Sequence, residues 1–277
     1  MMPRLTLLFI LLASFLPAVA AQDDPKDAAR AELNAGVQAF RQANYEEAVG
    51  HFEQAVALQP EDITAHLYLA TAYAQTFVPG VDTPENVVWA TKALNEYREV
   101  LRRDSTSVIS LKGIAFLEMQ LKNYDQAKES YQKASALDPS DPELFYSVGV
   151  IDWSIAYRDI AAEKKKLSAK AQDSLFLSAG CADARTAVQA NVNDGLAMLT
   201  KAVSLREDYD DAMAYLNLLY RLRADVECGN KEAHAADLKK ANEWTDMAMA
   251  ARKKKADAAA AAAAKRGQGS TDTPPPR

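Results

Sequence analysis

The chain has 277 residues, of which 49% are hydrophobic and 25% are charged, a composition typical of a water-soluble protein with a substantial core. Its formal net charge of −6 argues against general binding to nucleic acid or anionic lipid, because both ligands are themselves negatively charged. Alanine is abundant, whereas only 10 glycines and 11 prolines occur, so the composition favours helix.

The first 21 residues resemble a cleavable export signal. Residues 1–4 form a short basic head, residues 5–16 form an apolar run, and small residues follow before Gln22. These are the three parts of a secretory signal peptide, and the apolar run is shorter than the roughly 20 residues that span a bilayer. We predict cleavage after Ala20 or Ala21 and export, to a bacterial periplasm or further out. A retained anchor or a buried helix is the alternative. No later segment is apolar enough to cross a membrane.

Two segments of 34 residues, 29–62 and 108–141, superpose without a gap. Each contains two amphipathic stretches, separated by a turn and ended by a proline, which lacks an amide donor and clashes within a helix. The small residues should allow close approach of helices, and the large ones should fill the space between them. The matched positions are Gly36 and Ala115, Asn44 and Asn123, Ala48 and Ala127, Phe52 and Tyr131, Ala55 and Ala134, Leu58 and Leu137, and Pro60 and Pro139.

This pattern resembles the tetratricopeptide repeat (TPR) family, whose repeat carries a glycine, aromatic and alanine pattern with a final proline. The same spacing, with insertions, continues along most of residues 29–250. Repeat two contains 11 additional residues and repeat four contains 34, by the shift of their small residues. The predicted repeats are 29–62, 63–107, 108–141, 142–209 and 210–253.

We therefore predict an all-α fold, a right-handed α-solenoid of about five TPR-like helix pairs over residues 22–255. Insertions are expected in repeats two, four and five, each between the first and second helix of its repeat. The second helix of repeat five leaves two registers open, with Trp244 or Thr245 at the large position. Residues 256–277 should form an alanine-rich extension of the last helix and then, from Lys265, a disordered tail that contains prolines.

The family resemblance also implies a binding surface, because the first helix of each TPR repeat lines the concave groove of the superhelix. Transferred to matching positions, the partner-binding candidates are Phe40, Arg41, Lys112, Phe116, Met119, Tyr146, Trp153 and Arg221. Aromatic residues and arginine often dominate binding energy. The alternative is that Phe116, Met119 and Trp153 contact neighbouring helices as core residues.

The nature of the guest follows from what the groove lacks. Family members that grip a carboxyl terminus use a clamp of lysine and asparagine, but Leu33 and Val37 stand where that clamp would begin. We therefore expect an amphipathic helix or an extended apolar peptide instead. In the insertion of repeat two, Phe77, Val78 and Val81 are expected to form a binding lip, or else to fold back on the solenoid. Within the same insertion, Thr83 and Pro84 indicate a helix start.

Two cysteines, Cys181 and Cys228, fall in the insertions of consecutive repeats. An even pair in an exported protein suggests a disulfide, and linkers on the same edge of a solenoid could bring the sulfurs together. The bridge would close a loop of about 48 residues and contribute at most about 4 kcal/mol. Two buried free thiols are the alternative.

No residues form a catalytic pattern. The three histidines, His51, His66 and His234, show no metal-ligand spacing, and neither a phosphate-binding loop nor a nucleophile elbow occurs. Two basic runs, 164–166 and 252–255, are interpreted as solvated helix faces. We expect a non-catalytic scaffold without metal or cofactor that binds other proteins or peptides. The alternatives are an architectural subunit of a cell-envelope assembly (pilus, secretion or wall synthesis) and, less favoured, an enzyme with its site in the insertions. The sequence does not define the oligomeric state.

Overall fold

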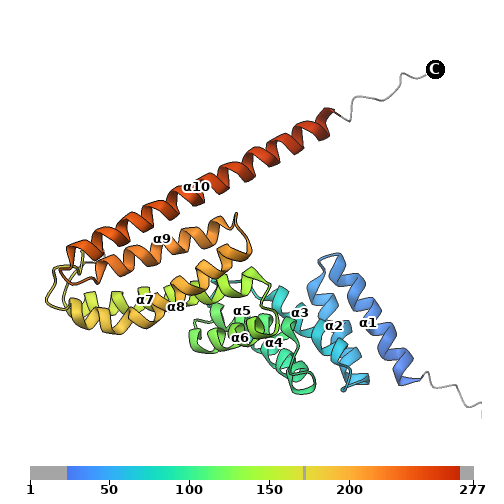
Figure 1. Ribbon diagram of the computed structural model, residues 1–277. Coiled ribbons are helices and arrows are strands. Elements are labelled where there is room, and N and C mark those ends of the chain that lie inside the picture. The colour runs from blue at the N-terminus through green and yellow to red at the C-terminus, as the bar shows by residue number, and fades with distance from the viewer. Residues whose placement is uncertain (1–23, 171–172, 269–277) are drawn as a thin grey trace, which may run out of the picture.

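The computed structural model describes residues 24–170 and 173–268. The predicted signal peptide and the tail from residue 269 onward lie outside this part of the chain. The described residues form ten helices and no strand, arranged as five antiparallel pairs in chain order (Figure 1). The predicted all-α solenoid is therefore confirmed. The helices are α1 (Pro25–Arg41), α2 (Tyr45–Leu58), α3 (Ile63–Thr76), α4 (Pro84–Arg103), α5 (Val108–Gln120), α6 (Tyr124–Leu137), α7 (Pro142–Lys166), α8 (Cys181–Leu205), α9 (Asp210–Asp225) and α10 (Lys231–Gln268).

Side-chain caps mark the start of six of these helices, including α10, where Asn230 accepts from the amide of Ala233 at 3.2 Å. Asp24, Asp62, Thr83, Ser107 and Asp141 each accept a hydrogen bond from a backbone amide two or three residues later, which satisfies an amide that has no partner within its helix. Proline occupies the first helical position of α1, α4 and α7, where its missing amide costs nothing. The predicted start of α4 after Thr83 is confirmed.

The first helices of three pairs end in the same hydrogen-bonded turn. Ala43, Lys122 and Ser168 have left-handed backbone conformations, with φ of 61°, 64° and 54°. After α1, the amide of Asn44 donates to the carbonyl of Ala39, and the amide of Ala43 donates to that of Phe40. The ends of α5 and α7 repeat this pattern. This is the Schellman arrangement, and it turns the chain back within three residues after α1 and α5.

The insertions lengthen helices as well as linkers, which differs from the prediction that they lie between the helices. In repeat four, α7 has 25 residues against 13 in α5, and α8 has 25 against 14 in α6. Their linker, residues 167–180, contains only part of the additional chain. In repeat two, α4 has 20 residues against 14 in α2. The reason is that helical periodicity continues through the inserted residues, so they extend the existing helices.

Three apolar clusters follow one another along the solenoid, the first around α1–α5, the second around α5–α7 and the third around α7–α10. The small residues at the matched positions, Ala48, Ala55, Ala127 and Ala134, are buried, and Phe52 fills the space between α1 and α2. The expectation for Leu58 and Leu137 is wrong: they are 40% and 44% exposed. Each lies at the last residue of its helix, where no following turn covers it.

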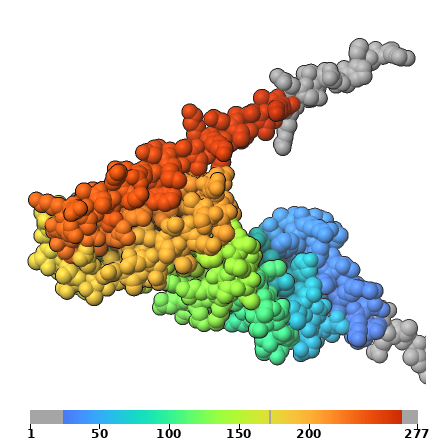
Figure 2. Space-filling view, viewed as in Figure 1, coloured from blue at the N-terminus to red at the C-terminus, as the bar shows by residue number. Residues whose placement is uncertain are grey.

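Helix α10 extends far beyond its partner. It has 38 residues against 16 in α9, and it projects from the body as a rod (Figures 1 and 2). All side chains of residues 252–265 are exposed, so this part is stabilised by the helix propensity of alanine rather than by packing. At its start, Arg252 and Lys255 pair with Asp210 at 2.8 and 2.6 Å. The helix runs to Gln268, so the predicted start of the disordered tail at Lys265 is wrong.

One charged cluster is buried between α6, α7 and α8. The side chain of Asp152 is inaccessible to solvent, and its Oδ1 lies 2.6 Å from Lys128 Nζ, which also lies 3.3 Å from Asp194. Oδ2 of Asp152 is buried without a hydrogen-bond partner among the described residues. Burial raises the pKa of Asp152 to about 6, although the hydrogen bond from Lys128 acts in the opposite direction.

A glycine at the crossing of α7 and α8 gives a test of this packing. A Cβ added at Gly149 would lie 2.4 Å from Leu199 Cγ, and Leu199 is fully buried. We predict that Gly149→Ala lowers the free energy of unfolding by about 1–3 kcal/mol. The matched control is Gly50→Ala in α2, where nothing lies within 4 Å, and it should raise stability by up to about 1 kcal/mol. Urea unfolding followed by circular dichroism compares the two, and equal stabilities would contradict the close approach.

The buried carboxyl of Asp152 predicts a pH dependence. Its folded pKa lies above the ordinary value of 3.8, so its contribution to stability is full below about pH 3.8 and is lost as pH rises through 6. A shift of one pKa unit corresponds to about 1.36 kcal/mol. The free energy of unfolding should therefore fall by about 1–3 kcal/mol over this pH range. Asp152→Asn does not titrate, so its urea midpoint should fall less than that of the unmodified protein between pH 4 and pH 7. Parallel curves for the two proteins would refute this assignment.

Candidate interaction groove

The first helices of the repeats line two open hollows. The N-terminal hollow, of about 400 Å³, lies between α3, α5 and α7 and includes Thr71, Gln75, Lys112 and Phe116 in its lining. The C-terminal hollow, of about 360 Å³, lies between α7, α9 and α10 and includes Trp153, Tyr157, Leu218 and Arg221. Their linings combine apolar surface with a few charged groups, as is usual for sites that bind peptides or ligands.

Helix α7 contributes one continuous face to both hollows. Glu143 and Ser147 reach the N-terminal hollow, and Trp153, Tyr157 and Ile160 reach the C-terminal one. Residues three or four apart lie on the same side of a helix, which relates Glu143 to Ser147 and Trp153 to Tyr157 and Ile160. Tyr146, three residues after Glu143 and seven before Trp153, connects the two sets. We use the term groove for the two hollows together with the face of α7 that joins them.

Five aromatic rings form an unbroken series along the groove, which we call the aromatic stripe. Tyr146 contacts Tyr209 and Tyr215, with ring centroids 4.9 and 5.8 Å apart. Trp153 contacts Tyr215 at 5.3 Å and stacks on Tyr157 at 5.3 Å, with an angle of 22° between the planes. Exposure increases along the stripe, from Tyr209 at 4% to Tyr157 at 56%. The stripe therefore joins the core to an open aromatic surface.

Three polar groups of the stripe have no hydrogen-bond partner among the described residues. Within the described residues, no hydrogen bond is made by the hydroxyls of Tyr157 and Tyr215 or by the indole N–H of Trp153. The hydroxyl of Tyr215 is protonated at neutral pH, because the ordinary tyrosine pKa of about 10 is raised further by burial. By contrast, Arg221 is already positioned, because its guanidinium donates to the side-chain carbonyls of Asn217 and Asn242, each at 2.8 Å.

The linker between α7 and α8 forms one wall of the C-terminal hollow. Asp225 at the end of α9 accepts hydrogen bonds from Ser174 Oγ at 2.5 Å and from the amide of Leu175 at 2.9 Å. The side chain of Leu175 is buried, and the ring of Phe176 lies 4.3 Å from that of His234 in α10. These contacts fasten the linker to both helices of the last pair.

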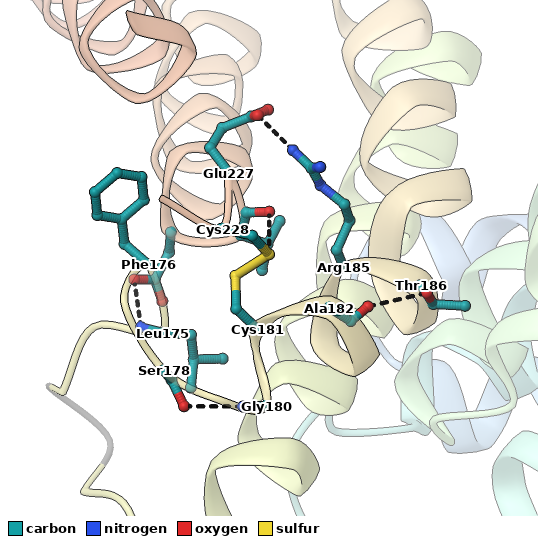
Figure 3. Close-up of a disulfide and its surroundings, with 12 residues drawn as sticks. Leu175, Phe176, Ser178, Gly180, Cys181, Ala182, Arg185, Thr186, Glu227 and Cys228 are labelled. Atoms are coloured by element: carbon teal, nitrogen blue, oxygen red, sulfur yellow. Dashed lines mark hydrogen bonds and ion pairs between the residues drawn. A yellow bond between two sulfur atoms is a disulfide. The ribbon is translucent and has the colours of Figure 1, made fainter. Parts of the chain in front are cut away.

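Cys181 and Cys228 form a covalent link behind this wall. Their sulfurs are 2.16 Å apart and their Cα atoms 5.4 Å apart (Figure 3). Cys181 is the first residue of α8 rather than a linker residue as predicted, and Cys228 lies in the short linker before α10. Arg185 in the next turn of α8 pairs with Glu227 beside the bridge. The link joins the base of the linker to the last helix pair.

The structure gathers some of the predicted groove residues and separates others. Lys112 and Phe116 lie in the N-terminal hollow, Trp153 and Arg221 in the C-terminal one, and Tyr146 in the stripe between them. Besides Tyr146, three candidates line neither hollow. Phe40 packs on Tyr45 and the first core cluster, Arg41 is exposed at the end of α1, and Met119 packs on the second cluster.

The predicted insertion lip is wrong in one of its three residues. Phe77 is only 6% exposed and belongs to the first core cluster, because α3 ends at Thr76 and the chain folds back there. Val78 and Val81 are 53% and 42% exposed. The side chain of Asn86 fixes their backbone by donating to both carbonyls and accepting from the amide of Val78.

The histidines have local partners. His51 and His66 lie beside Glu32 and Glu96, and His234 beside the carbonyl of Ala224. In the described ranges, no three His, Cys, Asp or Glu side chains are arranged to hold a metal ion. No helix there is long and apolar enough to span a bilayer. In the last helix, Trp244 packs against the third core cluster.

Three stripe residues were missed by sequence reasoning, namely Tyr157, Tyr209 and Tyr215. Tyr157 follows Trp153 by four residues, so helical spacing places it on the same face, and it could have been found. Tyr215 lies on α9 and meets Trp153 only through the packing of α9 on α7, which no local pattern encodes.

Comparison with known proteins supports the class of the fold. Residues 117–153, which include α6, match a family model described as TPR repeat. Hsp70-Hsp90 organizing protein 3 of Arabidopsis thaliana is 29% identical over 120 residues, which are 43% of this chain and 20% of that protein. The chain thus spans about a fifth of the length of this curated relative. The segment that matches the family model is therefore similar to a TPR repeat.

Solved structures extend the likeness to most of the chain. A crystal structure of MamA superposes with a TM-score of 0.57 at 12% identity, covering 83% of this chain and 95% of MamA. MamA from Desulfovibrio magneticus RS-1 gives 0.54 at 14% identity, with 81% and 97% covered. YrrB, described as a TPR protein with an unusual peptide-binding site, gives 0.51 at 14% identity, with 82% and 93% covered. At these identities the likeness shows the fold alone, and that fold is a TPR solenoid.

The cysteine pair generates a direct prediction. After alkylation in denaturant without reductant, the purified protein should gain no mass, because both sulfurs are in the bridge. With reductant, it should gain the mass of two alkyl groups. Denaturant is needed because Cys181 is buried, so a free thiol there would also resist the reagent. Two alkylated cysteines without reductant would refute the bridge. Its removal by Cys181→Ser with Cys228→Ser should lower the free energy of unfolding by up to about 4 kcal/mol.

Proposed function

We propose that this protein is an exported, non-catalytic interaction scaffold that binds a segment of a partner protein in its groove. The observation that carries the proposal is the aromatic stripe, whose exposed end combines stacked rings with unused hydrogen-bond donors. Large rigid rings supply contact area at a low cost in conformational entropy, and such residues often dominate the energy of an interface.

The character of the groove favours binding over catalysis. Several of its charged side chains are engaged in pairs, such as Lys112 with Asp141 at 2.7 Å, and the charged groups do not converge on one point as an acid, a base and a nucleophile would. The names of two similar proteins point the same way: one is an organizing protein for two others, and YrrB is described as having a peptide-binding site. An extended or helical segment with apolar side chains would match the lining.

Export is the second part of the proposal. The basic head and apolar run of residues 1–16 support it, and so does the cysteine pair at bonding distance, since structural disulfides persist in oxidising compartments. A periplasm is the compartment that we favour. Detection of the mature protein, with its first residue near Gln22, in a periplasmic fraction would support this part.

The groove is tested by partner capture. The immobilised mature protein is exposed to a cell-envelope extract, and bound proteins are identified by mass spectrometry. The double variant Phe116→Ala with Trp153→Ala removes one aromatic anchor from each hollow. It should weaken binding of the captured partner at least about tenfold, as expected for loss of a major anchor.

Two further variants keep this result interpretable. Tyr157→Ala changes a side chain that is 56% exposed, so it should weaken binding without destabilising the fold. Leu177→Ala is the matched control, because Leu177 is 80% exposed and lines neither hollow. Equal capture by the double variant and the control would show that the groove does not bind the partner.

A further inference from the structure

The sequence that follows α10 is rich in proline, as are many segments that bind in grooves lined by aromatic side chains. Residues 269–277 read Gly-Ser-Thr-Asp-Thr-Pro-Pro-Pro-Arg. Consecutive prolines favour the extended polyproline II helix, because each ring fixes φ near −65° and removes an amide donor. Such segments bind in grooves lined by aromatic side chains, at a low entropic cost because they are already extended.

The C-terminal hollow offers the matching surface. Trp153 and Tyr157 lie stacked and partly exposed, and Leu218 on α9 adds apolar surface beside them. The carbonyls of a polyproline II segment have no partners within their own chain. The indole N–H of Trp153 and the hydroxyl of Tyr157, which make no hydrogen bond within the described residues, are donors of the kind that would bind them.

Charge adds to this match. Asp173 is exposed on the linker wall of the C-terminal hollow, where its carboxylate accepts from the amide of Lys170. Arg277 directly follows the prolines and could pair with Asp173, although the lining also contains Lys164 and Arg221.

The length of α10 determines whose groove the prolines can reach. Asn242 of α10 marks the level of the C-terminal hollow, because it accepts a hydrogen bond from Arg221. From Asn242 to Gln268 the helix rises by about 39 Å, at 1.5 Å per residue. The eight residues from 269 to Pro276 span at most about 29 Å when fully extended. The prolines therefore cannot return to the C-terminal hollow of their own chain while α10 is helical.

We propose that residues 273–277 of one copy bind in the C-terminal hollow of a second copy, with the prolines lying on Trp153 and Tyr157. The proposal rests on the groove being a peptide-binding site. The donor segment and the acceptor hollow are different surfaces of the molecule. Each copy can therefore insert its own segment into one neighbour while its hollow binds the segment of another. Such a contact is heterologous and produces rings or open chains of molecules rather than closed twofold dimers. The exposed rod of α10 holds the next copy away from the body.

Sedimentation velocity of the mature protein over a range of concentrations tests this arrangement. The unmodified protein should form species that grow with concentration. The donor variant, Pro274→Ala with Pro275→Ala and Pro276→Ala, should stay monomeric over the same range, and so should the acceptor variant Tyr157→Ala. An equimolar mixture of these two variants should stop at a dimer, since one intact segment and one intact hollow remain. Met249→Ala is the control, because this side chain is 58% exposed on α10 but lines neither hollow, and it should assemble as the unmodified protein does.

A synthetic peptide provides the second measurement. A fluorescent peptide of residues 269–277 should bind the donor variant, whose hollow is empty of competitors, and the Tyr157→Ala substitution in that variant should weaken binding at least about tenfold. The same peptide with three alanines in place of the prolines is its matched control. Monomeric behaviour of the unmodified protein at all concentrations, assembly that survives the donor substitutions, or equal binding of both peptides would each overturn the proposal.

Failure of this proposal is distinct from failure of the proposed function. If the peptide does not bind but the captured partner still depends on Trp153, the groove binds another protein and only self-recognition is wrong. If neither the peptide nor the partner depends on the aromatic stripe, the groove itself is wrongly assigned.

Discussion

The close approach of neighbouring helices, made possible by a small residue opposite a large one, is the constraint on which the rest of this structure depends. Gly36 faces Phe52, Gly113 faces Tyr97 and Gly149 faces Leu199. A side chain at any of these positions would push two helices apart. Because every helix packs on the next, an error at one crossing would displace everything that follows along the solenoid. The spacing of the hollows therefore depends on residues that touch no guest.

Helix α7 takes part both in this packing and in the surface of the groove. Its buried side carries Gly149 and Asp152 toward α8, and its opposite side carries the face that joins the two hollows. Its additional length adds Tyr157 one turn after Trp153, and Tyr215 of α9 completes the series of rings. The insertion in repeat four thus extends the groove instead of forming a separate lobe. The linker and the bridge at its base then fix one side of that groove.

The sequence predicted the helix pairs because small and large residues recur at a fixed spacing, and that recurrence reflects local packing within each repeat. It predicted the cysteine pair because consecutive linkers share an edge. It did not show that the insertions lengthen helices, since an alignment counts additional residues without placing them. Phe77 was misjudged because the first residue after a helix can fold inward or outward, and only its neighbours decide. Tyr215 required knowledge of how α9 lies on α7.

The covalent link between Cys181 and Cys228 also defines how the molecule would carry mechanical tension. If one end of the chain were anchored and α10 were pulled, the force would pass directly through the bridge, because covalent bonds are far stronger than helix packing. The two cysteines are 47 residues apart in the sequence. The bridge would therefore keep about 170 Å of chain from being extended, at 3.6 Å per residue. The chain inside the closed loop, which includes most of α8 and all of α9, could not be extended while the bridge remained intact. Helices α7 and α10, which form the other walls of the C-terminal hollow, lie outside the closed loop and would carry the load.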